Sequence, residues 1–231
     1  SWCLSMTMLE PRPTTSPPRW DDSRPSDWSP LWVPPPTWGT ERDETRNTWG
    51  SAAGILAAKK LARPLLPWQQ HVADVALEID PATGRLAYRQ VVVTIPRQSG
   101  KTTGLLFTVM VLRCLTFGRR QRIVYTAQDR NSAREKFSEE FVPILREAPG
   151  LREGVDFKVR EANGSEAIEF LGSGSTIKIS ATLNNSGHGR TLDMPGIDEA
   201  FEHQTTDVEQ GFRVPMITRP EPQLWVLSTA G

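Results

Sequence analysis

The stretch from Val91 to Thr103 (VVVTIPRQSGKTT) constrains the fold of this 231-residue chain more than any other. A β-branched run ends at Ile95, a short polar turn follows, and an apolar helical segment (LLFTVMVLRCL) begins soon afterwards. A phosphate-binding loop requires strand, glycine-bearing loop and helix in this order, because the loop N–H groups and the helix N-terminus converge on one anion. The stretch therefore predicts a P-loop in an α/β fold.

The residues of this loop have predicted roles that follow from their chemistry. Lys101 is placed to reach the β- and γ-phosphates of a nucleotide, and the Thr102 hydroxyl is placed to hold Mg²⁺. The other residues expected to bind the nucleotide here are Pro96, Arg97, Gln98, Ser99, Gly100 and Thr103. The match to G-x-x-x-x-G-K-[ST] is imperfect, because Ile95 stands at the first glycine. The alternative is an exposed lysine in an ordinary turn between a strand and a helix.

Arg97 lies inside this loop, and two interpretations of it stay open. A guanidinium beside the γ-phosphate can neutralise the charge that develops during cleavage, as an arginine finger supplied by the same chain. The same residue can instead form a salt bridge that only shapes the loop.

Charge and cysteine content argue against several other classes of protein. Lys plus Arg and Asp plus Glu both total 27, so no net basic field indicates a nucleic-acid binder, although a local patch would escape this test. Cys3 and Cys114 lack metal-ligand spacing and indicate no disulfide scaffold. The sequence has no apolar run of about 18 residues and no signal-peptide pattern at its start. We therefore expect a soluble intracellular protein.

Residues 1–48 differ in composition from the rest of the chain. Nine prolines fall between Pro11 and Pro36, and six tryptophans occur by Trp49. Proline at this density does not sustain helices or sheet ladders. We therefore expect a disordered or polyproline-like tail over residues 1–48 and a folded domain over residues 49–231.

The folded part alternates between apolar strands and helical segments. Helices are expected over residues 51–61, 68–79, 102–117 and 130–145, and strands over residues 91–95, 122–127, 167–170, 176–180 and 224–231. Loops are expected over residues 150–159 and 183–196. This alternation favours a mainly parallel central sheet with helices on both faces.

A second group of functional residue types lies about 100 residues after the P-loop. A P-loop fold needs a carboxylate at the end of a neighbouring strand for the Mg²⁺ shell, and Asp198, after Ile197, is the candidate. Glu199 would be the general base that polarises the attacking water. Pro195 and Gly196 interrupt the strand expected just upstream, which leaves its register open. A solvated Asp-Glu pair in a loop is the alternative.

Gln69 is the candidate for recognising the base of the nucleotide. It lies at the start of a predicted helix, about 30 residues before the P-loop. A glutamine amide offers a donor and an acceptor that match the N6 and N7 edge of adenine. Gln70 is the alternative reader, and an exposed surface glutamine is the remaining possibility.

Five short motifs occur in one order along the chain. They are W-Q at 68–69, P-R-Q-S-G-K-T at 96–102, I-V-Y-T-A-Q at 123–128, I-D-E-A-F at 197–201 and L-S-T-A-G at 227–231. Together they resemble the N-terminal ATPase domain of the large terminase subunit of tailed bacteriophages, an ASCE-type P-loop NTPase. The resemblance covers residues 49–231. That family typically lacks the first Walker A glycine and carries an arginine near position 97, so the imperfect match becomes a mark of the family.

The resemblance implies further roles for individual residues. Asp198 and Glu199 match the Walker B aspartate and the catalytic carboxylate, and Gln69 matches the adenine motif. Ser228 and Thr229 match the coupling motif, which senses the γ-phosphate and links hydrolysis to motion. The family's second arginine, which reaches a neighbouring subunit's ATP, sits shortly before Walker B. Arg190 is the nominee, and a loop arginine that binds DNA or only solvent is its alternative.

The activity implied by the resemblance is Mg²⁺-dependent hydrolysis of ATP that drives double-stranded DNA into a procapsid. The implied partners are DNA, further copies of the chain in a ring, the phage portal and the small terminase subunit, in the host cytoplasm and without a membrane. The sequence stops at the coupling motif, before the nuclease domain of this family, so we expect no nuclease activity from it. Two alternatives stay open, a two-domain helicase or translocase and a non-catalytic nucleotide-binding assembly fragment.

Overall fold

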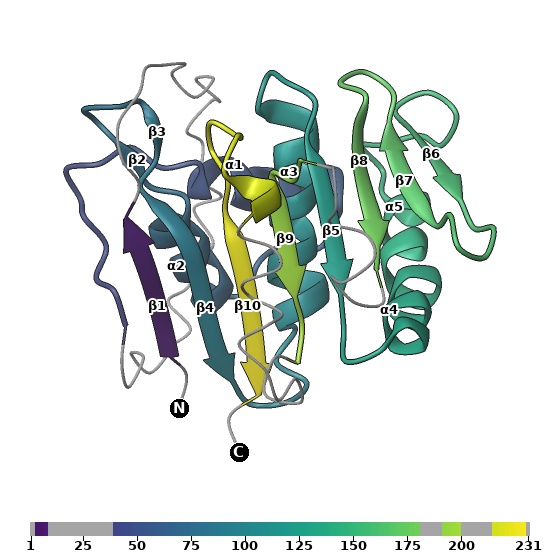
Figure 1. The fold of residues 1–231 in the computed structure, drawn as a ribbon, viewed down its shortest axis with the longest axis horizontal. Coiled ribbons are helices and arrows are strands. Elements are labelled where there is room, and N and C mark those ends of the chain that lie inside the picture. Colours follow the sequence, from purple (N-terminus) through teal and green to yellow (C-terminus); the bar gives the residue numbers. More distant parts are fainter. Residues whose placement is uncertain (1–2, 9–38, 181–190, 200–213, 230–231) are drawn as a thin grey trace.

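The computed structural model describes residues 3–8, 39–180, 191–199 and 214–229, with only the backbone described for 3–8. Its strands are β1 (Cys3–Met8), β2 (Ile79–Asp80), β3 (Arg85–Leu86), β4 (Tyr88–Ile95), β5 (Arg122–Thr126), β6 (Phe157–Arg160), β7 (Ala167–Phe170), β8 (Ser175–Ile179), β9 (Met194–Ile197) and β10 (Leu224–Thr229). Eight of them form one sheet in the order β1-β4-β10-β9-β5-β8-β7-β6, and β2 and β3 form a small ribbon (Figure 1).

The helical segments are α1 (Gly50–Ile55), η1 (Leu56–Lys60), α2 (Pro67–Ala76), η2 (Lys101–Leu106), α3 (Phe107–Thr116), α4 (Arg130–Lys136), η3 (Phe137–Phe141) and α5 (Val142–Glu147). The η segments are π-helical turns that continue or begin an α-helix. All the helices and strands expected from the sequence are present within a few residues of their expected bounds. The expectation of a loop over residues 150–159 is wrong for residues 157–159, which belong to β6. Within the described ranges, no helix is long and apolar enough to cross a membrane.

The five central strands β4, β10, β9, β5 and β8 run parallel, as the alternation of strands and helices predicted. At the two sides of the sheet, β1 runs antiparallel to β4 and β7 runs antiparallel to β8. β10 lies between β4 and β9 (Figure 1). The expectation that the strand before Asp198 directly neighbours the P-loop strand is therefore wrong, because one strand separates them.

The sheet buries a large apolar core on one face and a smaller cluster on the other. Along β4, Val91, Val93 and Ile95 belong to the large core, whereas Val92 packs against the smaller cluster. α1, α2 and α3 lie behind the sheet in Figure 1 and contribute to the large core. The smaller cluster includes Met216, from a short helical stretch that begins at Val214. Helical residues therefore cover both faces, to unequal extents.

The strand that precedes Asp198 is β9, and all four of its residues are buried. Its sequence is Met-Pro-Gly-Ile, so residues 194–196 belong to a strand and not to the loop expected over residues 183–196. β9 pairs with β5 over four residues but with β10 over only two, beginning at Gly196. The shorter ladder agrees with the missing N–H of Pro195. The pairing with β5 fixes the register that the sequence left open.

Gly196 permits close packing between β9 and the helix that follows the P-loop. A Cβ atom at this position would lie 2.6 Å from Met110 Cε and 3.1 Å from Leu106 Cδ2. A glycine that weakens an isolated strand therefore lets η2 and α3 pack directly against the sheet.

Two stretches inside the expected tail are part of the fold, which corrects that expectation for them. Residues 3–8 form β1, which pairs with β4. Their sequence, CLSMTM, has the period-2 alternation of a strand, and the proline content of the following residues obscured this signal. Residues 39–48 contact the domain through Glu78. Residues 1–2 and 9–38 lie outside the described part of the chain.

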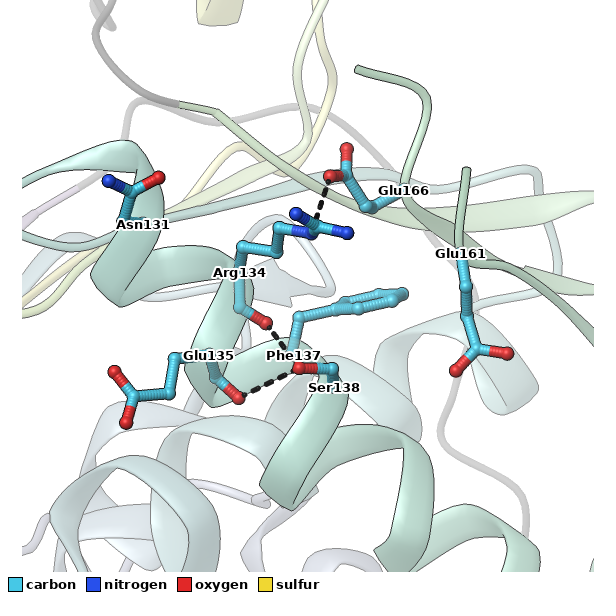
Figure 2. A pocket seen from close by; sticks show the side chains of 7 residues that line it. All are labelled: Asn131, Arg134, Glu135, Phe137, Ser138, Glu161 and Glu166. Atoms are coloured by element: carbon cyan, nitrogen blue, oxygen red, sulfur yellow. Dashed lines mark hydrogen bonds and ion pairs between the residues drawn. The ribbon is translucent and has the colours of Figure 1, made fainter. Parts of the chain in front are cut away.

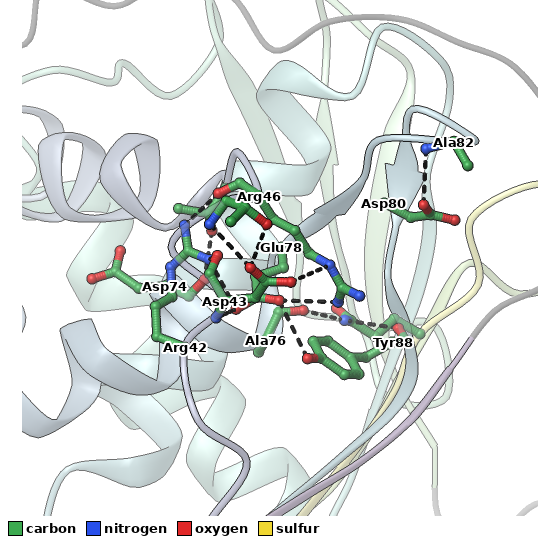
Figure 3. A network of polar contacts seen from close by, with 12 residues as sticks. Arg42, Asp43, Arg46, Asp74, Ala76, Glu78, Asp80, Ala82 and Tyr88 are labelled. Atoms are coloured by element: carbon green, nitrogen blue, oxygen red, sulfur yellow. Dashed lines mark hydrogen bonds and ion pairs between the residues drawn. The ribbon is translucent and has the colours of Figure 1, made fainter.

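Glu78 is a fully buried carboxylate that holds the segment before α1 (Figure 3). Its Oε1 accepts hydrogen bonds from Arg42 Nη1 at 2.9 Å and from the Asp43 N–H at 2.8 Å. Its Oε2 accepts from Arg46 Nη1 and from the Tyr88 hydroxyl, both at 3.2 Å. These four donors compensate for burying a charge. Glu78 therefore ties the segment before α1 to the start of β4.

Replacing Glu78 by glutamine should lower the free energy of unfolding by about 2 kcal/mol, because two ordered arginines lose their buried counter-charge. Urea denaturation followed by circular dichroism measures the change. The matched control is Glu147→Gln, which removes a carboxylate paired with Arg63 at the surface and should leave the denaturation midpoint unchanged. Equal destabilisation by the two substitutions would disprove the anchoring role of Glu78.

Asp193 is a second residue with a buried carboxylate, and it lies at the N-terminal ends of three parallel strands. Its Oδ1 accepts from Arg219 Nε at 2.6 Å, and its Oδ2 accepts from the Arg122 N–H at 2.8 Å. The Asp193 carbonyl accepts from the Gln223 N–H at 2.9 Å. Asp193 therefore joins the starts of β5, β9 and β10 at this edge of the sheet.

Candidate active site

The chain turns between β4 and η2 through the loop predicted to bind phosphate. Gly100 has a φ of 78° and directly precedes η2, and Gln98 has a φ of 57°. This left-handed conformation suits glycine but is strained for glutamine, and such strain concentrates at functional loops. Gln98 is exposed, whereas Lys101 and Thr102 are buried. The loop is thus open to solvent at its tip and anchored at its end.

Lys101 contacts the end of β10. Its Nζ donates a hydrogen bond to Thr229 Oγ1 at 2.8 Å. Because β10 lies between β4 and β9, the last residue of β10 meets the lysine at the end of the P-loop. The preceding residue, Ser228, has a buried hydroxyl without a hydrogen-bond partner in the described part of the chain. The structure therefore brings one of the two predicted coupling residues, Thr229, against the P-loop.

Asp198 is the first residue after β9, and its side chain meets the P-loop helix. Its N–H donates to the Thr126 carbonyl at 2.9 Å, which continues the pairing with β5. Its Oδ2 accepts from Thr102 Oγ1 at 2.5 Å, so the two residues predicted to share Mg²⁺ are in contact. The Tyr125 hydroxyl donates to the same oxygen at 3.2 Å. Sequence reasoning missed Tyr125, although a hydroxyl near the end of an apolar strand is a signal that could have found it.

Glu199 differs from Asp198 in both backbone and environment. It has a φ of 57° and is exposed, whereas Asp198 is buried. Its N–H donates to Asp198 Oδ1 at 3.0 Å. One carboxylate is therefore fixed inside the site, and the other is accessible to water.

Gln69 lies beside the P-loop and is almost fully buried. Its Nε2 donates to the Gly100 carbonyl at 2.9 Å, and its Oε1 accepts from the Leu66 N–H at 2.8 Å. A Cβ at Gly104 would lie 2.5 Å from this amide nitrogen, so that glycine makes room for Gln69. The alternative reader, Gln70, is bonded to α1 through the Gly50 carbonyl instead. Of the two glutamines, only Gln69 contacts the P-loop, and its role toward adenine stays a prediction.

The remaining predicted site residues lie in the loop or outside the described residues. Pro96 and Arg97 are exposed, and Arg97 makes no ion pair with any described residue. Ser99 and Thr103 are half-buried, and the Ser99 hydroxyl has no hydrogen-bond partner in the described ranges. Arg190 lies outside the described residues.

The residues brought together here fit a nucleotide with Mg²⁺. The Thr102 hydroxyl and the Asp198 carboxylate are hard oxygen ligands, and Mg²⁺ takes one or two protein ligands together with substrate phosphates and water. Among the described residues, no group of three or more His, Cys, Asp or Glu could hold a metal ion by itself. The unpartnered Ser99 hydroxyl lies in the loop, where a phosphate oxygen can accept its hydrogen bond.

A separate pocket lies at α4, away from these residues (Figure 2). It is lined by Asn131, Arg134, Glu135, Phe137, Ser138, Glu161 and Glu166. The buried Glu166 accepts from Arg130 Nη2 at 2.8 Å, and its other oxygen lies 3.4 Å from Arg134 Nε. Glu166 is thereby paired within the chain. None of the predicted site residues lines this pocket, and we assign no ligand to it.

Comparison with protein families shows which family the chain is similar to. The family described as "Terminase large subunit, T4likevirus-type, N-terminal" matches residues 92–230, which is more than half of the chain. A search of the curated proteins found no match.

Three solved structures of phage terminases are similar to this chain to different extents. The HK97 bacteriophage large terminase matches with a TM-score of 0.61 at 21% identity, over 79% of this chain and 38% of that protein. The Thermus phage P74-26 large terminase ATPase domain matches with a TM-score of 0.45 at 16% identity, over 62% of this chain and 60% of that domain. A large terminase from a thermophilic bacteriophage, in complex with ADP, matches with a TM-score of 0.45 at 14% identity, over 58% of this chain and 33% of that protein. The first likeness confirms the predicted α/β P-loop fold, and the other two are too weak to add to it.

Proposed function

The chain belongs to the family of T4-type terminase large subunits, within their N-terminal part, and on that premise we propose that it hydrolyses ATP to drive DNA packaging. The observation that carries the proposal is the 2.5 Å contact between Thr102 Oγ1 and Asp198 Oδ2. It joins the P-loop to the acidic strand end across the width of β10, which is the arrangement that a Mg²⁺-dependent nucleotide hydrolase needs.

The described contacts support specific roles in binding ATP. Lys101 and the loop N–H groups bind the β- and γ-phosphates, and the buried position of Lys101 strengthens this attraction by lowering the local dielectric. Gln69 uses one Nε2 hydrogen and one Oε1 lone pair in hydrogen bonds within the chain. Its second Nε2 hydrogen and second Oε1 lone pair recognise adenine. Ser228 and Thr229 sense the γ-phosphate, since Thr229 already contacts the lysine that would bind it.

Hydrolysis follows from the different environments of the two carboxylates. Thr102 and Asp198 hold Mg²⁺, which when bound neutralises charge on the phosphate oxygens. The exposed Glu199 accepts a proton from water as the water oxygen bonds to the γ-phosphorus and the bond to the departing ADP oxygen breaks. Arg97, at the exposed loop, stabilises the transition-state charge, and Arg190 does so from a neighbouring copy of the chain.

The partners are proposed from family membership. We propose that identical copies of the chain form a ring that translocates double-stranded DNA. The ring acts at the phage portal together with a small terminase subunit, in the host cytoplasm. Because the family match lies in the N-terminal part of the large subunit, we assign ATP hydrolysis and no nuclease activity to this chain.

Steady-state ATP hydrolysis with and without DNA tests this function. Linear duplex DNA should raise the hydrolysis rate of the wild-type chain, and single-stranded DNA of equal length should not. Stimulation by single strands alone would instead favour the two-domain helicase. A rate that neither form of DNA changes would count against a motor acting on DNA.

A further inference from the structure

We propose that Tyr125 is a positioning residue, which orients the Asp198 carboxylate for binding Mg²⁺. This inference rests on the proposed function, because it gives a role to a residue that would act through Asp198. Tyr125 lies within the I-V-Y-T-A-Q motif at 123–128, but no role was predicted for its hydroxyl.

The position of Tyr125 is fixed by its surroundings. It lies in β5, next to β9 in the sheet and directly opposite Gly196. Its side chain is fully buried, and its ring meets Phe141 edge-on with centroids 5.0 Å apart. Phe141 in turn stacks on Phe107 with centroids 4.3 Å apart. The ring is therefore held by packing, and its hydroxyl has a defined place at the C-terminal edge of the sheet.

The hydroxyl of Tyr125 completes a set of donors around Asp198. Oδ2 accepts from Tyr125 at 3.2 Å and from Thr102 at 2.5 Å, and Oδ1 accepts from the Glu199 N–H at 3.0 Å. A carboxylate with donors on both oxygens cannot rotate freely about χ2. The Tyr125 hydrogen bond comes from a strand, whereas in the proposed mechanism Thr102 holds Mg²⁺ and Glu199 acts on the attacking water. Tyr125 therefore supplies the donor that is independent of the nucleotide.

The Tyr125 hydroxyl acts as a hydrogen-bond donor to this carboxylate, because Asp198 Oδ2 is the acceptor in their contact.

The Mg²⁺ dependence of nucleotide binding tests this role with Tyr125→Phe, which removes the hydroxyl and keeps the ring. A fluorescent ATP analogue is titrated with Mg²⁺, and binding is also measured in EDTA. We expect the Mg²⁺ midpoint to rise by about tenfold, the effect of losing one hydrogen bond to a charged group, while affinity in EDTA stays at the wild-type value. Hydrolysis by the variant should recover at high Mg²⁺.

The chain offers a matched control in its other tyrosine. The Tyr88 hydroxyl donates to the buried carboxylate of Glu78 at the same distance, 3.2 Å, outside the nucleotide site. Tyr88→Phe should lower the melting temperature by a similar amount and leave the Mg²⁺ midpoint unchanged. A wild-type midpoint in Tyr125→Phe, or an equal shift in Tyr88→Phe, would overturn the proposal. If Mg²⁺ did not strengthen binding of the ATP analogue to the wild-type chain, the proposed function itself would be overturned.

Discussion

Lys101→Ala is expected to weaken nucleotide binding by about 100-fold or more. The ammonium group is the buried cation of the P-loop, and its removal takes away charge-assisted hydrogen bonds to two phosphates at once. Fold stability should change little, because the substitution removes only one hydrogen bond to the described residues, the one to Thr229. Isothermal titration with ATP and Mg²⁺ measures the affinity, and thermal unfolding measures the stability.

Lys59→Ala is the matched control for that substitution. Lys59 is exposed on η1, so its loss removes the same charge without touching the loop. It should bind ATP like the wild-type chain. If Lys101→Ala kept wild-type affinity, or Lys59→Ala lost it equally, the phosphates would not be bound by Lys101.

Glu199→Gln should stop hydrolysis and preserve ATP binding. The substitution removes the group that accepts the proton of the attacking water, and general-base catalysis contributes about 10²–10⁴-fold to a rate. The amide keeps the size of the side chain, and the Glu199 N–H still donates to Asp198. Single-turnover hydrolysis should therefore slow by that factor while the dissociation constant for ATP stays within about twofold, since Glu199 makes no ground-state contact with phosphate in this mechanism.

The control for this prediction is Glu139→Gln, an exposed glutamate on η3. It should leave both binding and hydrolysis unchanged. Wild-type turnover in Glu199→Gln would show that another group activates the water, and weakened binding in that variant would place Glu199 among the ligands of the ground state.

Local sequence was sufficient to predict the strand, loop and helix around Lys101, because β-branched residues, glycine and an apolar helix follow one another there. Asp198 was also predictable, because a P-loop fold needs a carboxylate at a strand end to hold Mg²⁺. The position of Thr229 against Lys101 depends on the strand order, which places β10 between β4 and β9. Strand order is set by packing between distant segments, and no local pattern encodes it.

The incorrect and missed predictions also arise from contacts between distant segments. Pro195 marks a loop by its intrinsic propensity, yet β9 accommodates it with a short ladder toward β10. The strand β1 was hidden by the prolines that follow it, and the tie between Glu78 and Arg42 joins residues 36 positions apart. Tyr125 was overlooked because its contact with Asp198 crosses from one strand to the next. In each case tertiary contacts outweigh the local signal.

The most direct test of the central claim is phosphate release from ATP by the wild-type chain, in Mg²⁺ and in EDTA, beside Lys101→Ala. We predict turnover in Mg²⁺, none in EDTA and none in the variant. Turnover that persists in EDTA or in Lys101→Ala would contradict a nucleotide site built from Lys101, Thr102 and Asp198, and so would a wild-type chain that binds no ATP.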